Sequence, residues 1–216
     1  MRHSVFAREG FWLIGICVIG AVLLAKFAGP AWALPMLVPI VLLLLLFQDP
    51  RRDVPLKPLA ALSPVDGTVL EVGLCRSGLL DRESLRIIIR VNPWGAYTVR
   101  APVEGTVFDP RDNAREGSRL TGRSGLWLRS DEGDDVVVAF SGRGWLGRPK
   151  SLRRYGERIG HGHRVALLRL APRCELYLPA NALPRVDAGD PVRAAMTELA
   201  ELRRDNPVRD ASEAGD

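Results

Sequence analysis

The sequence has little of what builds disulfide frameworks, metal clusters or redox centres: three cysteines and three histidines among 216 residues. Cys17, Cys75 and Cys174 lie far apart and match no metal-binding or redox spacing. His161 and His163 would share one face of a strand, but two histidines without a third ligand are typical of exposed turns, so we predict no metal site. These absences argue against a disulfide-stabilised secreted domain and favour a reducing, cytosolic setting.

Acidic residues are also in the minority. The chain carries 30 lysines and arginines against 25 aspartates and glutamates, which gives a net charge of +5. A basic protein can bind nucleic acid or an anionic membrane surface, although a bias in genome base composition explains the arginine excess equally well. The sequence contains no recognised nucleic-acid-binding module, so we predict a membrane, and not nucleic acid, as the partner.

Charge is almost missing from residues 11–47, where Lys26 is the only charged side chain. A break at residues 26–30 divides this apolar tract into two arms, 11–27 and 31–47. Each arm has about 17 residues, or ~25 Å as a helix, at the low end of what crosses a bilayer. We predict a transmembrane helical hairpin, with a single tilted span or a re-entrant loop as the alternatives.

Basic residues flank both ends of the tract: Arg2 and Arg8 before it, and Arg51, Arg52 and Lys57 after it. A hairpin with both ends in the cytosol therefore satisfies the positive-inside rule twice. The tract is too long for a cleaved signal peptide. We expect the protein at the cell (inner) membrane, with the rest of the chain on the cytoplasmic side.

After residue 54 the apolar runs become short and alternate with turn residues, and no helical periodicity interrupts them. The predicted fold class is mostly β: an N-terminal transmembrane helical hairpin followed by an antiparallel β sandwich or barrel-sandwich-hybrid-like domain. The predicted strands cover residues 68–72, 85–91, 105–108, 126–128, 136–140, 164–170 and 174–178.

A short motif occurs twice, as Pro-Val-Asp-Gly-Thr-Val at residues 64–69 and Pro-Val-Glu-Gly-Thr-Val at residues 102–107. Related hairpins occur in barrel-sandwich hybrid domains such as lipoyl carriers, although two similar turns leading into strands explain the motif equally well. Apolar residues at helical spacing predict a short helix over residues 194–204. The predicted domains are a membrane hairpin (1–50), a β-rich domain (51–195), and a short helix with a disordered tail (196–216).

Four blocks of sequence form a pattern. Residues 47–52 read Phe-Gln-Asp-Pro-Arg-Arg, residues 63–67 read Ser-Pro-Val-Asp-Gly, and residues 92–102 read Asn-Pro-Trp-Gly-Ala-Tyr-Thr-Val-Arg-Ala-Pro. Residues 168–179 read Leu-Arg-Leu-Ala-Pro-Arg-Cys-Glu-Leu-Tyr-Leu-Pro. In this order, and behind an apolar hairpin, the blocks resemble the short, membrane-hairpin class of phosphatidylserine decarboxylases. Its versions are Phe-Arg-Asp-Pro-x-Arg, Ser-Pro-Ala-Asp-Gly, Ser-Pro-x-x-Val-His-x-Asn-Arg-Ala-Pro, and a self-processing strand with a Gly-Ser pair.

The resemblance implies a chemistry from which this chain departs. In the family, an Asp orients a His, the His activates a Ser, and the Ser becomes a pyruvoyl group that forms a Schiff base with phosphatidylserine. Asp66 stands at the Asp position, where a turn residue before Gly67 explains it as well. Tyr97 stands at the His position, and Ala171 and Pro172 stand at the Gly-Ser pair. A phenol is a poor base at neutral pH and proline has no hydroxyl, so we predict that the pyruvoyl cofactor is absent.

A basic stretch is predicted to hold anionic lipid headgroups next to the membrane segment, with a solvated loop as the alternative. The headgroup candidates in this stretch are Arg143, Arg148, Arg153 and Arg154.

A thiol could in principle replace the missing serine hydroxyl. Cys174 lies two residues beyond Pro172, however, and this displacement along the strand gives the wrong geometry for a substitute acyl shift.

The sequence therefore predicts a membrane-anchored relative of these decarboxylases in phospholipid (phosphatidylethanolamine) metabolism, a non-processing homologue that binds lipid or a partner. The expected partners are an anionic or serine phospholipid, the membrane, and an intact decarboxylase homologue or a second copy of the chain. Two alternatives stay open: an active phosphatidylserine decarboxylase with a displaced catalytic centre, and a membrane-anchored scaffold.

Overall fold

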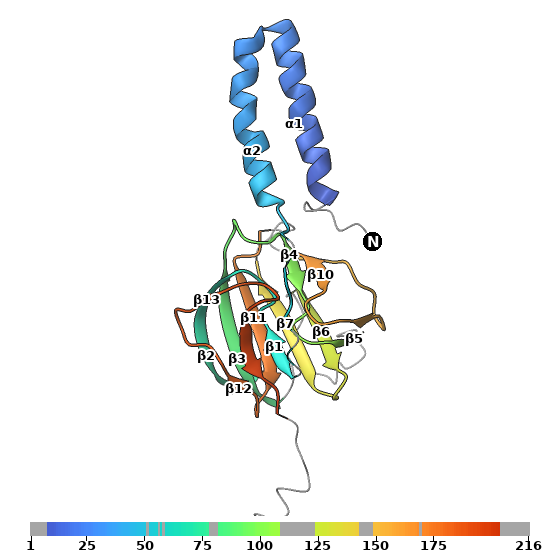
Figure 1. Ribbon diagram of the computed structural model, residues 1–216, viewed down its shortest axis with the longest axis vertical. Helices are drawn as coiled ribbons and strands as arrows, with labels where there is room; N and C mark the ends of the chain where they lie inside the picture. Colours follow the sequence, from blue (N-terminus) through green and yellow to red (C-terminus); the bar gives the residue numbers. More distant parts are fainter. Residues whose placement is uncertain are drawn as a thin grey trace, which may run out of the picture.

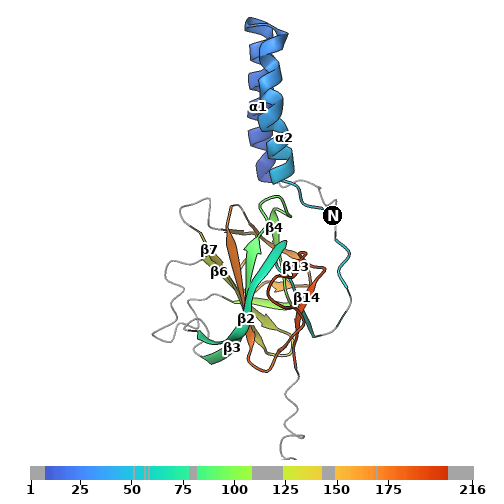
Figure 2. The same ribbon diagram turned by 90° about the vertical axis from the view of Figure 1, so that its left-hand side faces the viewer.

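The computed structural model describes residues 8–50, 52–55, 57, 59–77, 82–108, 124–142, 149–168 and 170–203. Within this part of the chain, a helical hairpin projects from one end of a β domain, as Figures 1 and 2 show from two sides. We call this end of the β domain the hairpin end. The prediction of a mostly β, antiparallel protein that begins with two helices is confirmed.

The hairpin consists of α1 (Arg8–Phe27), a 3-10 helix η1 (Pro30–Met36) and α2 (Leu37–Leu46), and its two arms lie side by side. The chain turns at Gly29, whose φ of 103° is a conformation that glycine adopts without steric cost. The predicted break between the two arms is therefore found where the sequence placed it.

The prediction that these helices cross a membrane is not supported. Among the described residues, no helix combines the length and the apolar character that crossing a bilayer requires. The second arm is short as an α-helix because Pro30 and Pro35 lie in a 3-10 segment, so α2 begins only at Leu37 and has ten residues.

The largest sheet has eight strands in the order β13-β2-β3-β11-β7-β6-β5-β9, and two three-stranded sheets have the orders β1-β14-β12 and β4-β10-β8. The strands are β1 (Ala60–Leu62), β2 (Gly67–Ser77), β3 (Arg82–Val91), β4 (Thr98–Arg100), β5 (Gly105–Phe108), β6 (Ser124–Ser130), β7 (Asp135–Ser141), β8 (Lys150–Ser151), β9 (Arg158–Ile159), β10 (Arg164–Leu167), β11 (Arg173–Pro179), β12 (Leu183–Pro184), β13 (Pro191–Val192) and β14 (Glu198–Glu201).

Every strand predicted from an apolar run is present, although its ends differ by a few residues. Alternation of side chains along the strands builds the core. In β3, Leu85, Ile87 and Ile89 are buried and pack with Leu176 and Leu178 of the neighbouring β11 in one continuous cluster. The core therefore lies against one face of the large sheet.

The repeated motif starts two strands, because Gly67 begins β2 and Gly105 begins β5. At each glycine the backbone passes very close to the neighbouring strand. An added Cβ would lie 2.1 Å from the Arg90 carbonyl oxygen at position 67, and 2.0 Å from the Arg129 carbonyl oxygen at position 105. Glycine is required at both positions because no larger residue fits.

The helix predicted over residues 194–204 is wrong. Residues Glu198–Glu201 form β14, which pairs with β1 on one side and β12 on the other. Leu199 and Ala200 are both buried, and because consecutive side chains of a strand point to opposite faces, both faces of β14 are covered. Tertiary pairing thus overrides the local helical spacing, and the β domain continues past the predicted boundary at residue 195. Residues 204–216, including the predicted tail, lie outside the described residues.

Candidate functional site

An aromatic pair joins the hairpin to the β domain. The rings of Phe47, which follows α2, and Tyr97, which precedes β4, have centroids 4.6 Å apart and planes inclined by 55°. They form a buried cluster with Leu167 of β10, against which side chains from the last turn of α2 pack. The Tyr97 N–H also donates to the Gln48 carbonyl oxygen at 3.0 Å. Tyr97 is therefore part of the joint between helices and strands.

A cavity of about 240 Å³ adjoins this joint. Its walls come from Leu46 at the end of α2, from residues 90–93 and 95–97 at the end of β3 and in the β3–β4 loop, and from Leu168 and residues 170–172 between β10 and β11. Because Tyr97 contributes to both the joint and the wall, we call it the Tyr97 cavity. Most of its lining side chains are apolar, so it suits an apolar group better than a charged one.

Three residues singled out from the sequence meet in this wall: Tyr97, Ala171 and Pro172. Ala171 is buried and Pro172 is exposed. The Pro172 carbonyl oxygen accepts a hydrogen bond from the Val91 N–H at 3.0 Å, which ties the loop before β11 to the end of β3. Backbone contacts thus hold position 172 at the cavity, but its side chain brings no hydroxyl and no acid or base there.

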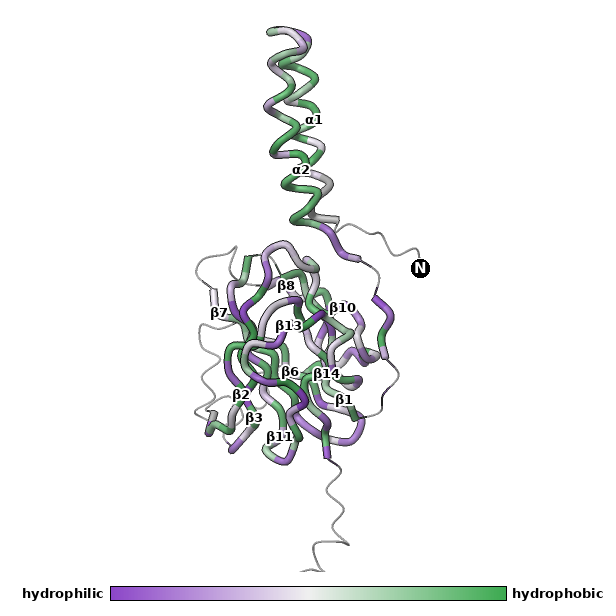
Figure 3. The backbone as a smooth tube through the Cα atoms, turned by 60° about the vertical axis from the view of Figure 1, so that its left-hand side comes forward, coloured by the Kyte–Doolittle hydropathy of each residue, from purple (hydrophilic) through white to green (hydrophobic). Residues whose placement is uncertain are grey.

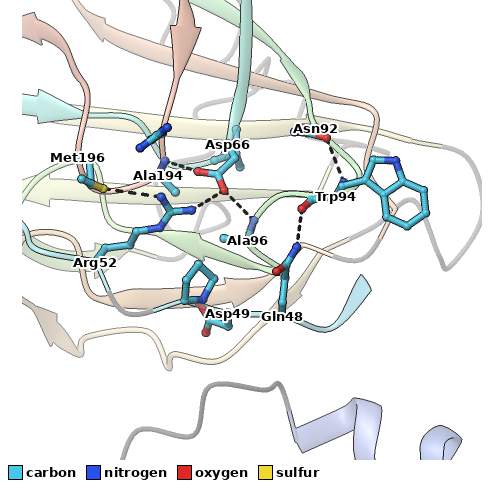
Figure 4. A network of polar contacts seen from close by, with 12 residues as sticks. Gln48, Asp49, Arg52, Asp66, Asn92, Trp94, Ala96, Ala194 and Met196 are labelled. Atoms are coloured by element: carbon cyan, nitrogen blue, oxygen red, sulfur yellow. Dashed lines mark hydrogen bonds and ion pairs between the residues drawn. The ribbon is translucent and has the colours of Figure 1, made fainter. Parts of the chain in front are cut away.

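The carboxylate of Asp66 is held by three donors (Figure 4). Its Oδ2 accepts bonds from the Arg52 guanidinium and the Ala96 N–H, and its Oδ1 accepts one from the Ala194 N–H, each at 2.7 Å. Gly95 lies so close that an added Cβ would be 2.6 Å from the Asp66 Cβ. Asp66 therefore crosslinks the turn before β2 to the β3–β4 loop and to the turn before β14.

A second carboxylate, which the sequence reasoning missed as a site, is fully buried where the hairpin meets the β domain. Asp49 Oδ1 accepts bonds from the Thr98 hydroxyl at 2.9 Å and the Arg100 guanidinium at 3.0 Å, and Arg164 Nε lies 2.7 Å from Oδ2. The available signal was a carboxylate three residues after the end of an apolar helix, since an aspartate buried there requires charged partners.

A larger and more polar cavity of about 540 Å³ lies on the other side of the β3–β4 loop. Its charged lining residues are Arg52, Asp66, Arg90 and Arg193, and we call it the arginine cavity. It shares residues 90–93 and Gly95 with the Tyr97 cavity, so the two spaces have a common wall.

Of the four arginines predicted to bind headgroups, the two that the structure describes, Arg153 and Arg154, line neither cavity. Arg143 and Arg148 lie outside the described residues. The Arg153 guanidinium lies 2.5 Å from the Glu157 carboxylate, which also accepts the Arg154 N–H at 3.1 Å. The Arg154 backbone N–H, together with the Arg153 side chain, lowers the pKa of Glu157. Arg153 is thus occupied by an ion pair of its own.

The remaining candidate nucleophile and metal ligands are placed as follows. Cys174 in β11 is fully buried, and this burial raises the pKa of its thiol well above the ordinary value. His161 Nε2 lies 3.0 Å from the Pro102 carbonyl oxygen, and His163 is exposed. In the part of the chain that the structure describes, no group of three or more His, Cys, Asp or Glu side chains is positioned to hold a metal ion.

No family model matches the chain. Individual relatives do match: over 209 residues it is 32% identical to the phosphatidylserine decarboxylase proenzyme of Nitrosomonas eutropha and 34% identical to that of Ralstonia nicotianae, with 93% of this chain and 97% of each relative covered. The proenzyme of Burkholderia ambifaria is 30% identical over 210 residues, covering 94% of this chain and 98% of the relative. The chain belongs to the phosphatidylserine decarboxylase proenzyme family.

Membership in the phosphatidylserine decarboxylase family confirms the resemblance drawn from the four sequence blocks. Among solved structures, glucose permease IIA from Mycoplasma capricolum aligns with a TM-score of 0.45 at 12% identity, over 67% of this chain and 96% of that chain, a likeness too low to bear on the fold. In this decarboxylase relative, the blocks around Tyr97 and Pro172 meet at the Tyr97 cavity, and Asp66 lies behind the loop that forms one wall.

Proposed function

We propose that this decarboxylase relative is a non-processing homologue that binds phospholipid at a membrane. The observation that carries the proposal is Pro172 in the wall of the Tyr97 cavity. Self-processing needs a hydroxyl that attacks the preceding carbonyl carbon and then leaves from the β-carbon as dehydroalanine forms. Proline has no such oxygen. Without that step no pyruvoyl group forms. The electron pair that stays on the substrate carbon when carbon dioxide leaves then has no acceptor.

Tyr97 and Asp66 support the same proposal. A phenol has an ordinary pKa near 10, so it is a weak base at neutral pH, and the Tyr97 ring is packed against Phe47 in the joint. The Asp66 carboxylate already accepts hydrogen bonds from Arg52 and two backbone N–H groups. These contacts suit a tyrosine and an aspartate that hold structure, not a base and the residue that orients it.

The membrane part of the proposal rests on the apolar residues of the hairpin, which Figure 3 colours green along much of both arms. Trp12 and Phe27 are each 81% exposed and Trp32 is 63% exposed. Moving apolar surface out of water is favourable by about 25 cal/mol per Å², so such a hairpin is more stable in lipid than in water. At the hairpin end, Trp94 and Leu170 are also large and exposed. We place the hairpin in contact with the cell (inner) membrane and the β domain on its cytoplasmic side.

The two alternatives are less well supported. An active decarboxylase with a displaced centre would need a new nucleophile, but the thiol of Cys174 is buried and its raised pKa keeps it protonated. A pure scaffold would need no cavities, whereas two cavities meet at the hairpin end. Lipid binding, alone or beside an intact decarboxylase or a second copy of the chain, accounts for more of the structure.

Intact-mass spectrometry of the purified, detergent-solubilised chain tests the absence of processing. We expect one species of 23.7 kDa, without a carbonyl adduct after reductive amination. A family member that carries the Gly-Ser pair, treated in parallel, is the positive control. Two fragments split near residue 171, or release of carbon dioxide from phosphatidylserine, would overturn the proposal.

Flotation with vesicles of phosphatidylcholine and phosphatidylserine tests the membrane half. We expect the chain to rise with the vesicles after the detergent is removed. A chain that stays in the dense fraction as a soluble protein would show that the hairpin does not bind lipid.

A further inference from the structure

The arginine cavity carries more positive charge than the protein neutralises. Of its four charged lining residues, Arg52 and Asp66 pair at 2.7 Å. Arg90 and Arg193 are both exposed, and neither guanidinium has a hydrogen-bond or ion-pair partner among the described residues. The cavity therefore presents two uncompensated positive charges to solvent.

The register of the sheet places a further positive side chain next to Arg90. β11 pairs with β3 so that Arg173 is directly opposite Arg90, and both residues are exposed. Directly opposed side chains of neighbouring strands share one face, and like charges in such a pair destabilise the sheet. An anion bound beside Arg90 would relieve this repulsion. Phosphate is the suitable anion, because a guanidinium offers it two parallel N–H donors.

Neutral donors line the same cavity. Thr68 of β2 is directly opposite Arg90 of β3, is exposed, and brings a hydroxyl group to the cavity. The Asn92 side-chain oxygen accepts the Trp94 N–H at 3.0 Å, so its amide nitrogen is the end that can donate to a ligand. Guanidinium, hydroxyl and amide donors together match the several acceptor oxygens of a phosphate group.

The position of the two adjoining cavities restricts the chemical class of the ligand further. Residues 90–93 and Gly95 line both the arginine cavity and the apolar Tyr97 cavity, so the two spaces adjoin. The Tyr97 cavity is also lined by Leu46, the last residue of α2, so it lies at the end of the domain that faces the hairpin. A phosphate joined to an apolar body, entering from the hairpin end, is the chemistry of a phospholipid.

We propose that Arg90 and Arg193 bind the phosphate of a phospholipid headgroup in the arginine cavity, while the apolar part of the lipid enters the Tyr97 cavity. This inference rests on the proposed phospholipid binding and names the residues that perform it. It differs from the basic stretch predicted from the sequence, of which Arg153 is paired with Glu157 and Arg143 and Arg148 lie outside the described residues.

The test uses the full chain in detergent and two probes: dihexanoyl phosphatidylserine, a short-chain lipid soluble as a monomer, and inorganic phosphate. Isothermal titration calorimetry at one fixed salt concentration gives the dissociation constants. For R90Q/R193Q we expect a rise of at least about tenfold for the lipid, since charge-assisted hydrogen bonds to phosphate are lost. Both residues are exposed and Arg90 is opposite the like charge of Arg173, so the variant should not melt at a lower temperature than the parent chain.

The charge-matched control is R76Q/R203Q. Arg76 lies at the end of β2 that is far from Thr68 and the arginine cavity. Arg203 follows β14, and both arginines are exposed. This control should bind the lipid within twofold of the parent chain. Equal weakening in both double variants would overturn the inference, as would an unchanged affinity in R90Q/R193Q.

The two probes separate the sources of phosphate. Inorganic phosphate should bind much more weakly than the lipid, because it gains nothing from the Tyr97 cavity. Equal affinity for both would make this a free-phosphate site and overturn the lipid assignment. A parent chain that binds no lipid at all would overturn the proposed function itself, whereas lipid binding that ignores Arg90 and Arg193 would overturn only this inference.

Discussion

Two groups of residues at the hairpin end are held in different ways. The first is a polar framework of two buried carboxylates, Asp49 and Asp66, each bound by an arginine and by further donors. The second is the cavity wall, where Tyr97 packs through its ring and Pro172 is held through its carbonyl oxygen. The framework uses charged side chains, and the wall at Pro172 uses only backbone.

The shape of the site thus depends on Asp66, at the aspartate position of the family's chemistry, but not on a side chain at the serine position, 172. Asp49 joins the hairpin exit to β4 and β10, and Asp66 joins three separate segments of the β domain. Neither crosslink involves a side chain at position 172. Substitutions in the framework should therefore unfold the hairpin end, while substitutions at position 172 should leave it folded.

Replacing Asp49 should break the framework most severely. Asp49→Ala leaves the guanidinium of Arg100, whose side chain is 9% exposed, buried without its anion. Removing one partner of a buried ion pair costs about 3–5 kcal/mol, so we expect the free energy of unfolding to fall by that amount. Urea denaturation in detergent, followed by tryptophan fluorescence, measures it.

Asp53→Ala is the matched control, because Asp53 is exposed in the same segment and the change of charge is identical. An exposed substitution of this kind should stay within about 0.5 kcal/mol of the parent chain. If the two variants were equally stable, Asp49 would not be a crosslink, and the distinction between framework and wall would fail.

A smaller effect is expected in the wall. Pro172→Ser restores a hydroxyl but keeps the carbonyl oxygen that accepts the Val91 N–H. Because Pro172 is exposed, the free energy of unfolding should fall by less than about 1 kcal/mol, mainly through the looser unfolded chain. The variant should also remain one species by intact mass, since the base position still holds a phenol. Cleavage at this serine would show that Pro172 alone blocks processing and that Tyr97 does not.

The sequence predicted the features that depend on local patterns. Apolar runs between turn residues located the strands, and the break before Pro30 located the hairpin turn, because period, turn chemistry and proline act over a few residues. Family motifs pointed to Tyr97 and Pro172, which the fold does bring into one wall.

Features that depend on pairing across the chain could not be predicted in this way. The spacing of residues 194–204 indicates a helix, yet β1 and β12 recruit Glu198–Glu201 as a strand. Likewise, nothing local indicates that Arg173 is opposite Arg90, since this follows from the register of β11 on β3. The sequence alone therefore does not indicate the arginine cavity, whereas it does indicate the basic stretch, whose charges are adjacent along the chain.

The smallest effect is expected at the exposed counterpart of the framework, the pair of Arg153 and Glu157. The Arg154 backbone N–H and the Arg153 guanidinium lower the pKa of Glu157 below its ordinary value. A carboxyl group with a lowered pKa stabilises the fold above its unfolded-state pKa, and this contribution is lost as the pH falls through its folded-state pKa. Because solvent screens the pair, acidification should loosen the turn at 153–157 without unfolding the domain.

Carbon-13 NMR titration of the Glu157 carboxyl group can separate the two donors. Arg153→Gln removes the guanidinium, so the pKa of Glu157 should rise part of the way towards its ordinary value. Arg154→Gln keeps the backbone N–H, so the pKa should stay low. A pKa that is already ordinary in the parent chain would mean that exposed pairs here are not held in solution. Charged contacts would then order this protein only where they are buried, as at Asp49.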